Sequence, residues 1–354
     1  MLSLLTALAC AGQAQFETPI PADDPWERAE PVAELEARFE AAWTYGQAHG
    51  SKSLMVLQGD QVLYEVYSPE HSNQSPWPMY SATKSFSCAM ASLAVSDGLM
   101  TLEEPVSATL SDWAGVPLKQ DVTLQHLLNF TSGLAQDRRT LTWDGLRAVE
   151  DQKVADKYAY AAAQPVQWAP GSQWEYGSSH LTAFGQVMEQ KLDGSPLDYL
   201  QARVFAPIGF RYAGWNHDPD GNPMLGYGAW TSTPEMAKFG VLLRDDGLWQ
   251  GEQVLPEGTL QMCMQGSTAN PAYGLAGWVN QEMGEGTRFN VAGTNQSGEG
   301  AAFLAGGPEM YVMAGASGQR IYVIPELDWV VVQQCDSNKF KDPEFLALLL
   351  GAAQ

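Results

Sequence analysis

The feature that most constrains the fold is a block of apolar runs near the C-terminal end of the chain. Residues 310–335, "MYVMAGASGQRIYVIPELDWVVVQQC", contain runs of β-branched and aromatic residues separated by turn-forming segments. Such residues favour the pleated, half-buried surface of a sheet. The block therefore predicts antiparallel strands.

An earlier segment predicts further strands. In residues 53–68, "SLMVLQGDQVLYEVYS", two alternating runs flank Gly59-Asp60, a pattern typical of a β-hairpin. The middle of the chain differs, because its apolar residues recur at helical spacing. There, Thr123 and the pair Ser195-Pro196 stand where helix caps are expected. The two ends of the chain can thus share one sheet, with a helical insert between them.

The expected fold class is α+β: an antiparallel sheet flanked by helices, plus an inserted all-helical domain. Residues 15–98 and 226–354 are predicted to form the sheet domain, and residues 99–225 the mainly helical one. A final helix is predicted over "KDPEFLALLLGAA", capped by Asp342 and Pro343.

The charge of the chain excludes some classes of partner. Acidic residues number 41 against 19 basic ones, which gives a formal net charge of −22. Such a field repels nucleic acids and anionic membranes, so no nucleic-acid partner is expected. We interpret the charge as a solvated surface.

The N-terminal segment indicates export. Residues 1–14 read as a signal peptide without its usual basic start, which predicts a periplasmic or secreted protein. Cys10 is a weaker candidate for lipid attachment. No later segment is long and apolar enough to span a bilayer.

The remaining cysteines and the histidines carry little signal. We interpret Cys88 as a small core residue, and leave open whether Cys263 and Cys335 pair. The five histidines are scattered and show no metal-ligand spacing. No metal and no cofactor are expected.

The chemical signal lies in "MYSATKSFSCAM", where Lys84 follows Ser81 by three residues at the start of an apolar helix. That spacing places both side chains on one helix face. A hydroxyl needs an unprotonated base beside it to become a nucleophile, and a lysine serves only if burial lowers its pKa from about 10.4. The alternative is two polar residues on a solvated helix face.

Two later segments strengthen the catalytic interpretation. "PGSQWEYGSS" places Tyr176 in a turn before a helix, where a phenol near Ser81 can relay a proton. "AGASGQR" puts small residues at the start of an expected strand. A backbone N–H of that strand, together with the Ser81 N–H, would form an oxyanion hole.

With these motifs in order, the chain resembles the serine β-lactamase and penicillin-binding-protein superfamily, in its class C-like branch. "YSATKSF", "VTLQHLLNFTSGL", "PGSQWEYGSS" and "GQRIYVIPELDWVVV" carry the resemblance. The chain is most similar to the 6-aminohexanoate-dimer hydrolase-like subgroup. The resemblance implies Ser81 as acylated nucleophile, Lys84 as base and Tyr176 as proton relay. It also implies an oxyanion hole formed by the N–H groups of Ser81 and Gln319.

The sequence departs from the motifs of many relatives at two places. Ser178 stands where they have an asparagine, and Ala316-Ser317-Gly318 stands where they have Lys-Thr-Gly. We expect Ser178, Ser317 and Gly318 to contact substrate. Arg320 can replace the missing cation if its side chain turns into the cleft.

The sequence therefore predicts an exported serine hydrolase that acts through an acyl-enzyme on a small ester or amide. One alternative is a non-catalytic relative that binds peptidoglycan or a small ligand. Another is a D-amino-acid peptidase or β-lactamase, which the uncharged strand motif fits poorly. The sequence leaves the substrate and the oligomeric state open.

Overall fold

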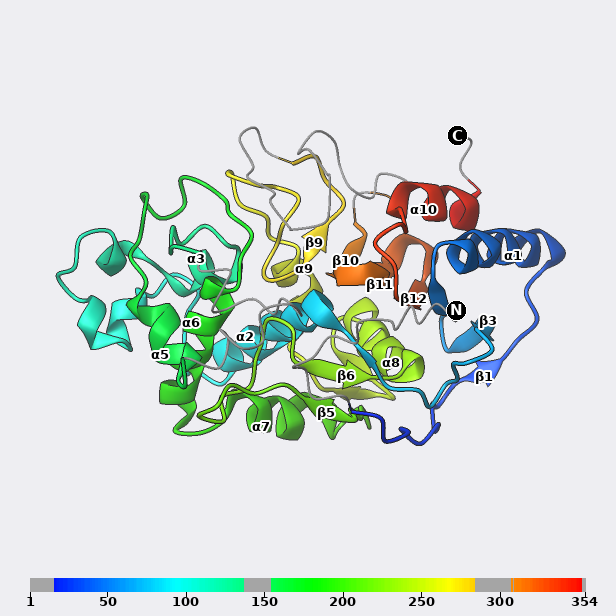
Figure 1. Ribbon diagram of the computed structural model, residues 1–354, viewed down its shortest axis with the longest axis horizontal. Coiled ribbons are helices and arrows are strands. Elements are labelled where there is room, and N and C mark those ends of the chain that lie inside the picture. Colours follow the sequence, from blue (N-terminus) through cyan, green and yellow to red (C-terminus); the bar gives the residue numbers. More distant parts are fainter. Residues whose placement is uncertain (1–15, 137–153, 284–306, 308, 352–354) are drawn as a thin grey trace, which may run out of the picture.

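A seven-stranded sheet organises the structure, a computed structural model that describes residues 16–136, 154–283, 307 and 309–351 (Figure 1). The strand order is β1-β3-β2-β12-β11-β10-β9. The strands are β1 (Glu27–Arg28), β2 (Ser51–Gln58), β3 (Gln61–Tyr67), β9 (Trp278–Val279), β10 (Tyr311–Gly315), β11 (Gln319–Ile324) and β12 (Trp329–Cys335).

The prediction that the two ends of the chain share one sheet is confirmed. Strand β2 of the early hairpin pairs antiparallel with β12, with Val56 opposite Val331. Strands β10, β11 and β12 form an antiparallel meander. The pair of β1 with β3 is parallel and only two residues long.

Helices cover both faces of the sheet, which explains the composition of its central strand. Helices α1 (Ala33–Ala48) and α10 (Asp342–Leu350) pack together on one face, and α8 (Thr233–Arg244) packs on the other (Figure 1). All seven residues of β12 are buried. A strand covered on both faces favours a continuous apolar run over polar alternation, and "WVVV" is such a run, followed by two buried glutamines.

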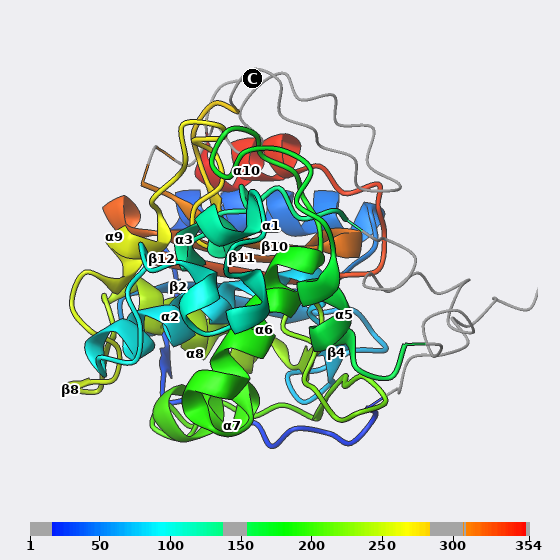
Figure 2. The ribbon, with the colours of Figure 1, turned by 90° about the vertical axis from the view of Figure 1, so that its left-hand side faces the viewer.

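The remaining described helices lie mostly to one side of the sheet, in front of it in Figure 2. They are α2 (Phe86–Ser96), α3 (Leu124–Leu128), α5 (Lys157–Ala163), α6 (Ser179–Leu192), α7 (Pro196–Leu200) and α9 (Thr259–Cys263). The predicted caps are confirmed: Thr123 accepts from the His126 N–H, and Ser195 from the N–H groups of Leu197 and Asp198. The exact domain boundaries stay a prediction.

Two short sheets complete the described strands. One has the order β4-β6-β5, from β4 (Trp77–Pro78), β5 (Gly214–Trp215) and β6 (Ala229–Thr231). The other pairs β7 (Leu248–Trp249) with β8 (Glu252–Gln253). Within the described ranges, we find no helix of sufficient length and apolarity to traverse a bilayer.

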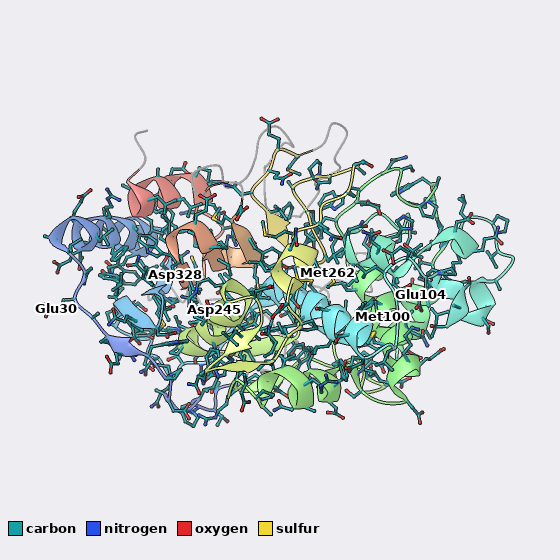
Figure 3. All side chains as sticks on the ribbon, turned by 180° about the vertical axis from the view of Figure 1, so that it is seen from behind. Glu30, Met100, Glu104, Asp245, Met262 and Asp328 are labelled. Carbon is teal, nitrogen blue, oxygen red and sulfur yellow. A yellow bond between two sulfur atoms is a disulfide. The ribbon has the colours of Figure 1, made fainter. Side chains whose placement is uncertain are left out.

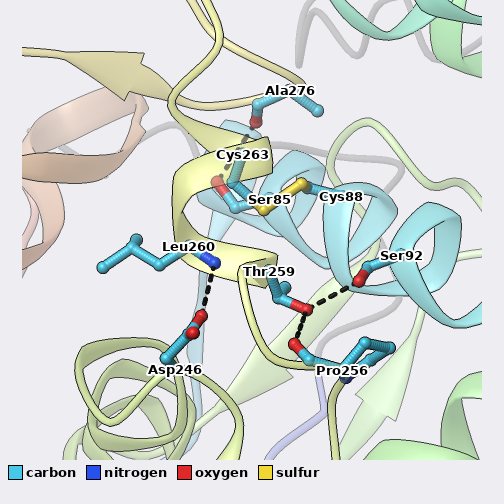
Figure 4. The surroundings of a disulfide bond; sticks show 9 residues. All are labelled: Ser85, Cys88, Ser92, Asp246, Pro256, Thr259, Leu260, Cys263 and Ala276. Carbon is cyan, nitrogen blue, oxygen red and sulfur yellow. Dashed lines mark hydrogen bonds between the residues drawn. A yellow bond between two sulfur atoms is a disulfide. The ribbon is translucent and has the colours of Figure 1, made fainter.

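The structure contains a cysteine pair that the sequence analysis did not propose. Cys88 on α2 forms a disulfide with Cys263 on α9, although 175 residues separate them (Figure 4). Cys335 is a buried free thiol. Cys88 is a fully buried core residue, as expected, and in addition it forms the disulfide, so Cys263 does not pair with Cys335. The fold brings α2 against α9, where Ser92 Oγ also lies 2.6 Å from Thr259 Oγ1. No local pattern encodes that contact.

One predicted cap is also corrected. Asp342 is the first residue of α10, and its carboxylate makes no cap hydrogen bond to that helix. It binds the guanidinium of Arg320 on β11 instead.

Candidate active site

The predicted nucleophile lies in a strained turn. Ser81 belongs to the 3₁₀ helix η1 (Tyr80–Ser85), which precedes α2, and Tyr80 adopts the left-handed conformation with φ of 47°. Residues three apart are aligned in a 3₁₀ helix, so Ser81 and Lys84 project from the same side. The Lys84 Nζ donates to Ser81 Oγ at 3.1 Å. The geometry expected from the S-x-x-K spacing is present.

The Lys84 amine is buried among neutral groups. Only 3% of this residue is exposed, and Nζ also donates to the Gly226 carbonyl at 2.6 Å. Because burial penalises the charged form, the pKa of Lys84 falls from its ordinary value of 10.5 to about 7. A large share of the amine is then neutral near pH 7, as a general base requires.

Tyr176 completes the group from another element. Its hydroxyl hydrogen-bonds to Ser81, and its ring centroid lies 5.3 Å from Lys84 Nζ. Burial raises the pKa of Tyr176 to about 12, although the Ser81 hydrogen bond and the charge of Arg320 oppose the rise. The phenol therefore keeps its proton near neutral pH, and can donate it while accepting another.

A cluster of aromatic rings holds Tyr176 in place. The Trp278 ring stacks on it at 6.0 Å between centroids, and three further rings surround it. These are Phe130, Trp174 and Tyr273. Such packing fixes the phenol without charged groups. Sequence reasoning gave these aromatics no position, because spacing does not distinguish a core ring from a ring at a site.

A buried polar network supports the same turn. Gln136 accepts the Ser179 N–H through Oε1 at 3.0 Å, and a Cβ built at Gly177 would lie only 1.8 Å from that oxygen. His180 binds Ser132 Oγ and the Glu175 carbonyl, and burial lowers its pKa to about 4. A side chain at Gly177 would therefore displace the Gln136 amide, and His180 is a neutral imidazole near pH 7.

On the opposite side, the end of β10 lies against η1. A Cβ built at Gly315 would come within 2.1 Å of the Met79 carbonyl oxygen and 3.2 Å of the Ala82 nitrogen. Any side chain here would collide with the backbone around the nucleophile. Strand β10 is therefore the strand that faces Ser81, since β11 lies deeper in the sheet between β10 and β12.

The expected second oxyanion donor, the Gln319 N–H, already has an acceptor within the turn. The Gln319 N–H donates to the Ala316 carbonyl and closes the turn, and the Gln319 side chain binds the backbone of Cys335. The Ala316 N–H lies one residue beyond the last ladder pair, Gly315 with Gln319. We find no acceptor for it among residues 16–136, 154–283 and 309–351, and Ala316 is exposed.

The other expected substrate residues fall into two groups. Ser178 lies with the catalytic group, because its Oγ and Lys84 Nζ both lie beside Gly226. Ser317 gives its N–H to Asn338 Oδ1 at 3.1 Å. Gly318 packs against Cys335, and the Arg320 guanidinium is bound by Asp342.

The missed positions share a cause. Gly226, Gly315 and Ala316 contact or face the site through backbone atoms, and such contacts leave no chemical signature in the sequence. In the described part of the chain, no group of three or more His, Cys, Asp or Glu residues is arranged to hold a metal ion.

Comparisons with known proteins identify relatives of this chain. Acyltransferase mokF from Monascus pilosus is 29% identical over 207 residues, which cover 50% of this chain and 50% of that protein. Esterase EstB from Burkholderia gladioli is 28% identical over 209 residues, 52% of this chain and 51% of the esterase. The chain thus spans about half the length of these two relatives.

A solved structure extends the likeness to the whole fold. The putative 6-aminohexanoate-dimer hydrolase from Bacillus anthracis superposes with a TM-score of 0.67 at 17% identity, covering 92% of this chain and 85% of that one. The sequence model of the Beta-lactamase family matches residues 34–352. The resemblance expected from the motifs is confirmed: this chain belongs to the Beta-lactamase family of serine hydrolases.

Proposed function

We propose that the protein is a serine hydrolase that acts through an acyl-enzyme on a small ester or amide. The observation that carries this proposal is the buried Lys84 amine, with a pKa of about 7, lying 3.1 Å from Ser81 Oγ. A structural role would not favour a buried lysine whose acceptors are neutral, because burying an amine without a carboxylate is costly.

The chemistry follows from the three side chains. Lys84 Nζ takes the proton of Ser81 as Oγ attacks the carbonyl carbon of the substrate. The phenol of Tyr176 is hydrogen-bonded to Ser81. It passes a proton to the leaving alcohol or amine when the tetrahedral intermediate collapses. Water then attacks the acyl-enzyme and gives a proton to the Tyr176 oxygen, while Lys84 Nζ returns the proton it took to Ser81 Oγ, which is released from the acyl group.

The oxyanion needs donors at the same place. The Ser81 N–H lies in the first turn of η1, where helical N–H groups lack an acceptor within the helix. We assign the second donor to the Ala316 N–H in place of Gln319, because β10 contacts the nucleophile turn through Gly315. Two such donors act on the negative charge that develops in the transition state.

The substrate class follows from what surrounds the site. Arg320 already pairs with Asp342, so it offers no free cation to a substrate carboxylate. A β-lactam or a D-amino-acid peptide carries such a carboxylate, and a lost charged hydrogen bond costs about 1.5–3 kcal/mol. The names of EstB and mokF support ester and acyl chemistry.

Export is part of the same proposal. The disulfide between Cys88 and Cys263 supports an oxidising compartment, since disulfides seldom persist in the cytosol. Fractionation of the native host tests this: recovery of the chain only with the cytosolic fraction would contradict export.

The decisive experiment compares Ser81→Ala with Ser87→Ala. Ser87 Oγ is buried on α2 and has no partner in the described chain, so its removal is a matched control. We expect Ser81→Ala to lose turnover of p-nitrophenyl acetate and labelling by a fluorophosphonate, while Ser87→Ala keeps both. Equal activity in all three proteins would end the proposal. A screen of short esters, linear amides and a chromogenic cephalosporin then ranks the substrates.

A further inference from the structure

The peptide group between Gly315 and Ala316 has two functional ends. Its N–H is the second oxyanion donor assigned above, and its carbonyl accepts a hydrogen bond from Arg320 Nη1 at 2.8 Å. One guanidinium therefore contacts the same rigid peptide plane that presents the Ala316 N–H.

Arg320 is itself held firmly. Its Nε and Nη2 bind the two carboxylate oxygens of Asp342 at 2.5 and 2.8 Å, and the Tyr322 hydroxyl donates to Asp342 Oδ1 at 2.7 Å. The side chains of Arg320 and Asp342 are only 13% and 5% exposed. Asp342 begins α10, where the helix N-terminus stabilises its negative charge.

The other hydrogen bonds of the turn beside Ser81 hold its later peptide groups: the Ala316 carbonyl accepts from the Gln319 N–H, the Ser317 N–H donates to Asn338, and the Gly318 carbonyl accepts from Gln333. Residues 315–318 read Gly-Ala-Ser-Gly, so no large side chain anchors them. Gly315 must also stay without a side chain, because of its contact with the Met79 carbonyl. Arg320 Nη1 donates to the carbonyls of Gly315 and Gln319, each at 2.8 Å, so it contacts both ends of the turn.

We propose that Arg320, oriented by Asp342, is a positioning residue for the oxyanion hole. It holds the Gly315–Ala316 peptide in the orientation that aims its N–H at the site. A cation donating to the carbonyl also polarises the peptide and strengthens its N–H as a donor. This inference rests on the proposed function and gives the Arg320–Asp342 pair a role behind the site.

The test uses Arg320→Gln, Arg320→Lys and Asp342→Asn in the full chain. Arg244→Gln is the matched control, because Arg244 is also a buried arginine, bound by Asp245, Asp328 and the Gly59 carbonyl. Figure 3 shows Asp245 and Asp328 near each other, at a distance from Glu104 and the helices around it. The readouts are kcat and KM for p-nitrophenyl acetate and the affinity of a boronic acid, whose serine adduct mimics the tetrahedral intermediate.

We expect Arg320→Gln to lower kcat about 10- to 100-fold, with KM within twofold, because the donor acts on the transition state. Boronate affinity should fall in parallel with kcat. Arg320→Lys should recover part of kcat and part of the boronate affinity. Asp342→Asn should have values between those of Arg320→Gln and the wild type. Arg244→Gln should lower the melting temperature alone. Wild-type kcat and boronate affinity in folded Arg320→Gln would overturn the proposal, and so would an equal loss in Arg244→Gln.

A further readout separates this inference from the proposed function. The amide NMR resonance of Ala316 should shift in Arg320→Gln and stay unchanged in Arg244→Gln, whether or not the protein turns over an ester. An unshifted resonance would overturn the positioning role. Absence of Ser81-dependent turnover in the wild type would overturn the proposed function, and the Ala316 resonance would still decide whether Arg320 fixes the peptide.

Discussion

Two buried lysines show how differently this fold treats the same side chain. Lys238 on α8 lies 2.9 Å from the Glu235 carboxylate and 2.7 Å from the Gly209 carbonyl, and Glu235 also accepts the Arg211 N–H. Lys84 is equally buried, at 3% exposure against 2% for Lys238. Its acceptors are a hydroxyl and a carbonyl.

The comparison teaches that burial alone does not make a lysine reactive. At Lys238 a carboxylate compensates for the lost hydration, so the ion pair is satisfied and structural. At Lys84 the lost hydration is uncompensated, and the amine gives up its proton near neutral pH. The nucleophile turn thus sacrifices stability for reactivity, a common property of catalytic sites.

The largest expected difference is in activity. Lys84→Met should lower kcat/KM for p-nitrophenyl acetate about 10²–10⁴-fold, because the general base is lost. Lys238→Met should keep kcat/KM per folded molecule within twofold. Steady-state assays on protein titrated with a fluorophosphonate measure both. Similar losses in the two variants would remove the distinction between the regions.

The next difference is in stability, where Lys238→Met is expected to have the larger effect. Lys238→Met should lower the free energy of unfolding by about 3–5 kcal/mol, because it leaves the Glu235 carboxylate buried and unpaired. Lys84→Met should leave that free energy unchanged or raise it by about 1–3 kcal/mol at pH 7, because it removes an uncompensated amine. Urea unfolding gives both values. A large destabilisation by Lys84→Met would show that its amine is a structural group after all.

The pH dependence gives the smallest effect per pH unit, and its sign follows from the lowered pKa of Lys84. Since the folded pKa of Lys84 is about 7, kcat/KM should fall about tenfold per unit below pH 7, with Ser81→Ala as the blank. The unfolded chain keeps this proton up to its ordinary pKa of 10.5, so it binds more protons than the folded chain between about pH 7 and 10.5. The wild type should gain stability relative to Lys84→Met as pH rises through this window, by at most about 1.4 kcal/mol per unit. A difference that stays constant from pH 7 to 10 would contradict the lowered pKa.

Local patterns predicted much of the site, because some chemistry is set by short-range geometry. The spacing of Ser81 and Lys84 guarantees that their side chains project together from any helical turn, and Tyr176 was recognised from its motif. The Gln319 N–H, expected as a donor to the site, has an acceptor in its own turn, and the sequence did not reveal this for a physical reason. Small residues fit a hairpin turn and a strand start equally well, so "AGASGQR" did not reveal that β10 ends at Gly315 and that Gln319 begins the strand behind it.

By itself, the sequence determined the periodicities, the caps at Thr123 and Ser195 and the spacing that brings Lys84 beside Ser81, since these depend on neighbours within a few residues. Tertiary structure alone decided that Lys84 is buried without a carboxylate, that Cys88 pairs with Cys263 and that Arg320 binds Asp342. The physical reason is that hydration, charge pairing and thiol proximity depend on which distant segments pack together. That packing is settled by the whole core, and no short stretch of the chain contains it.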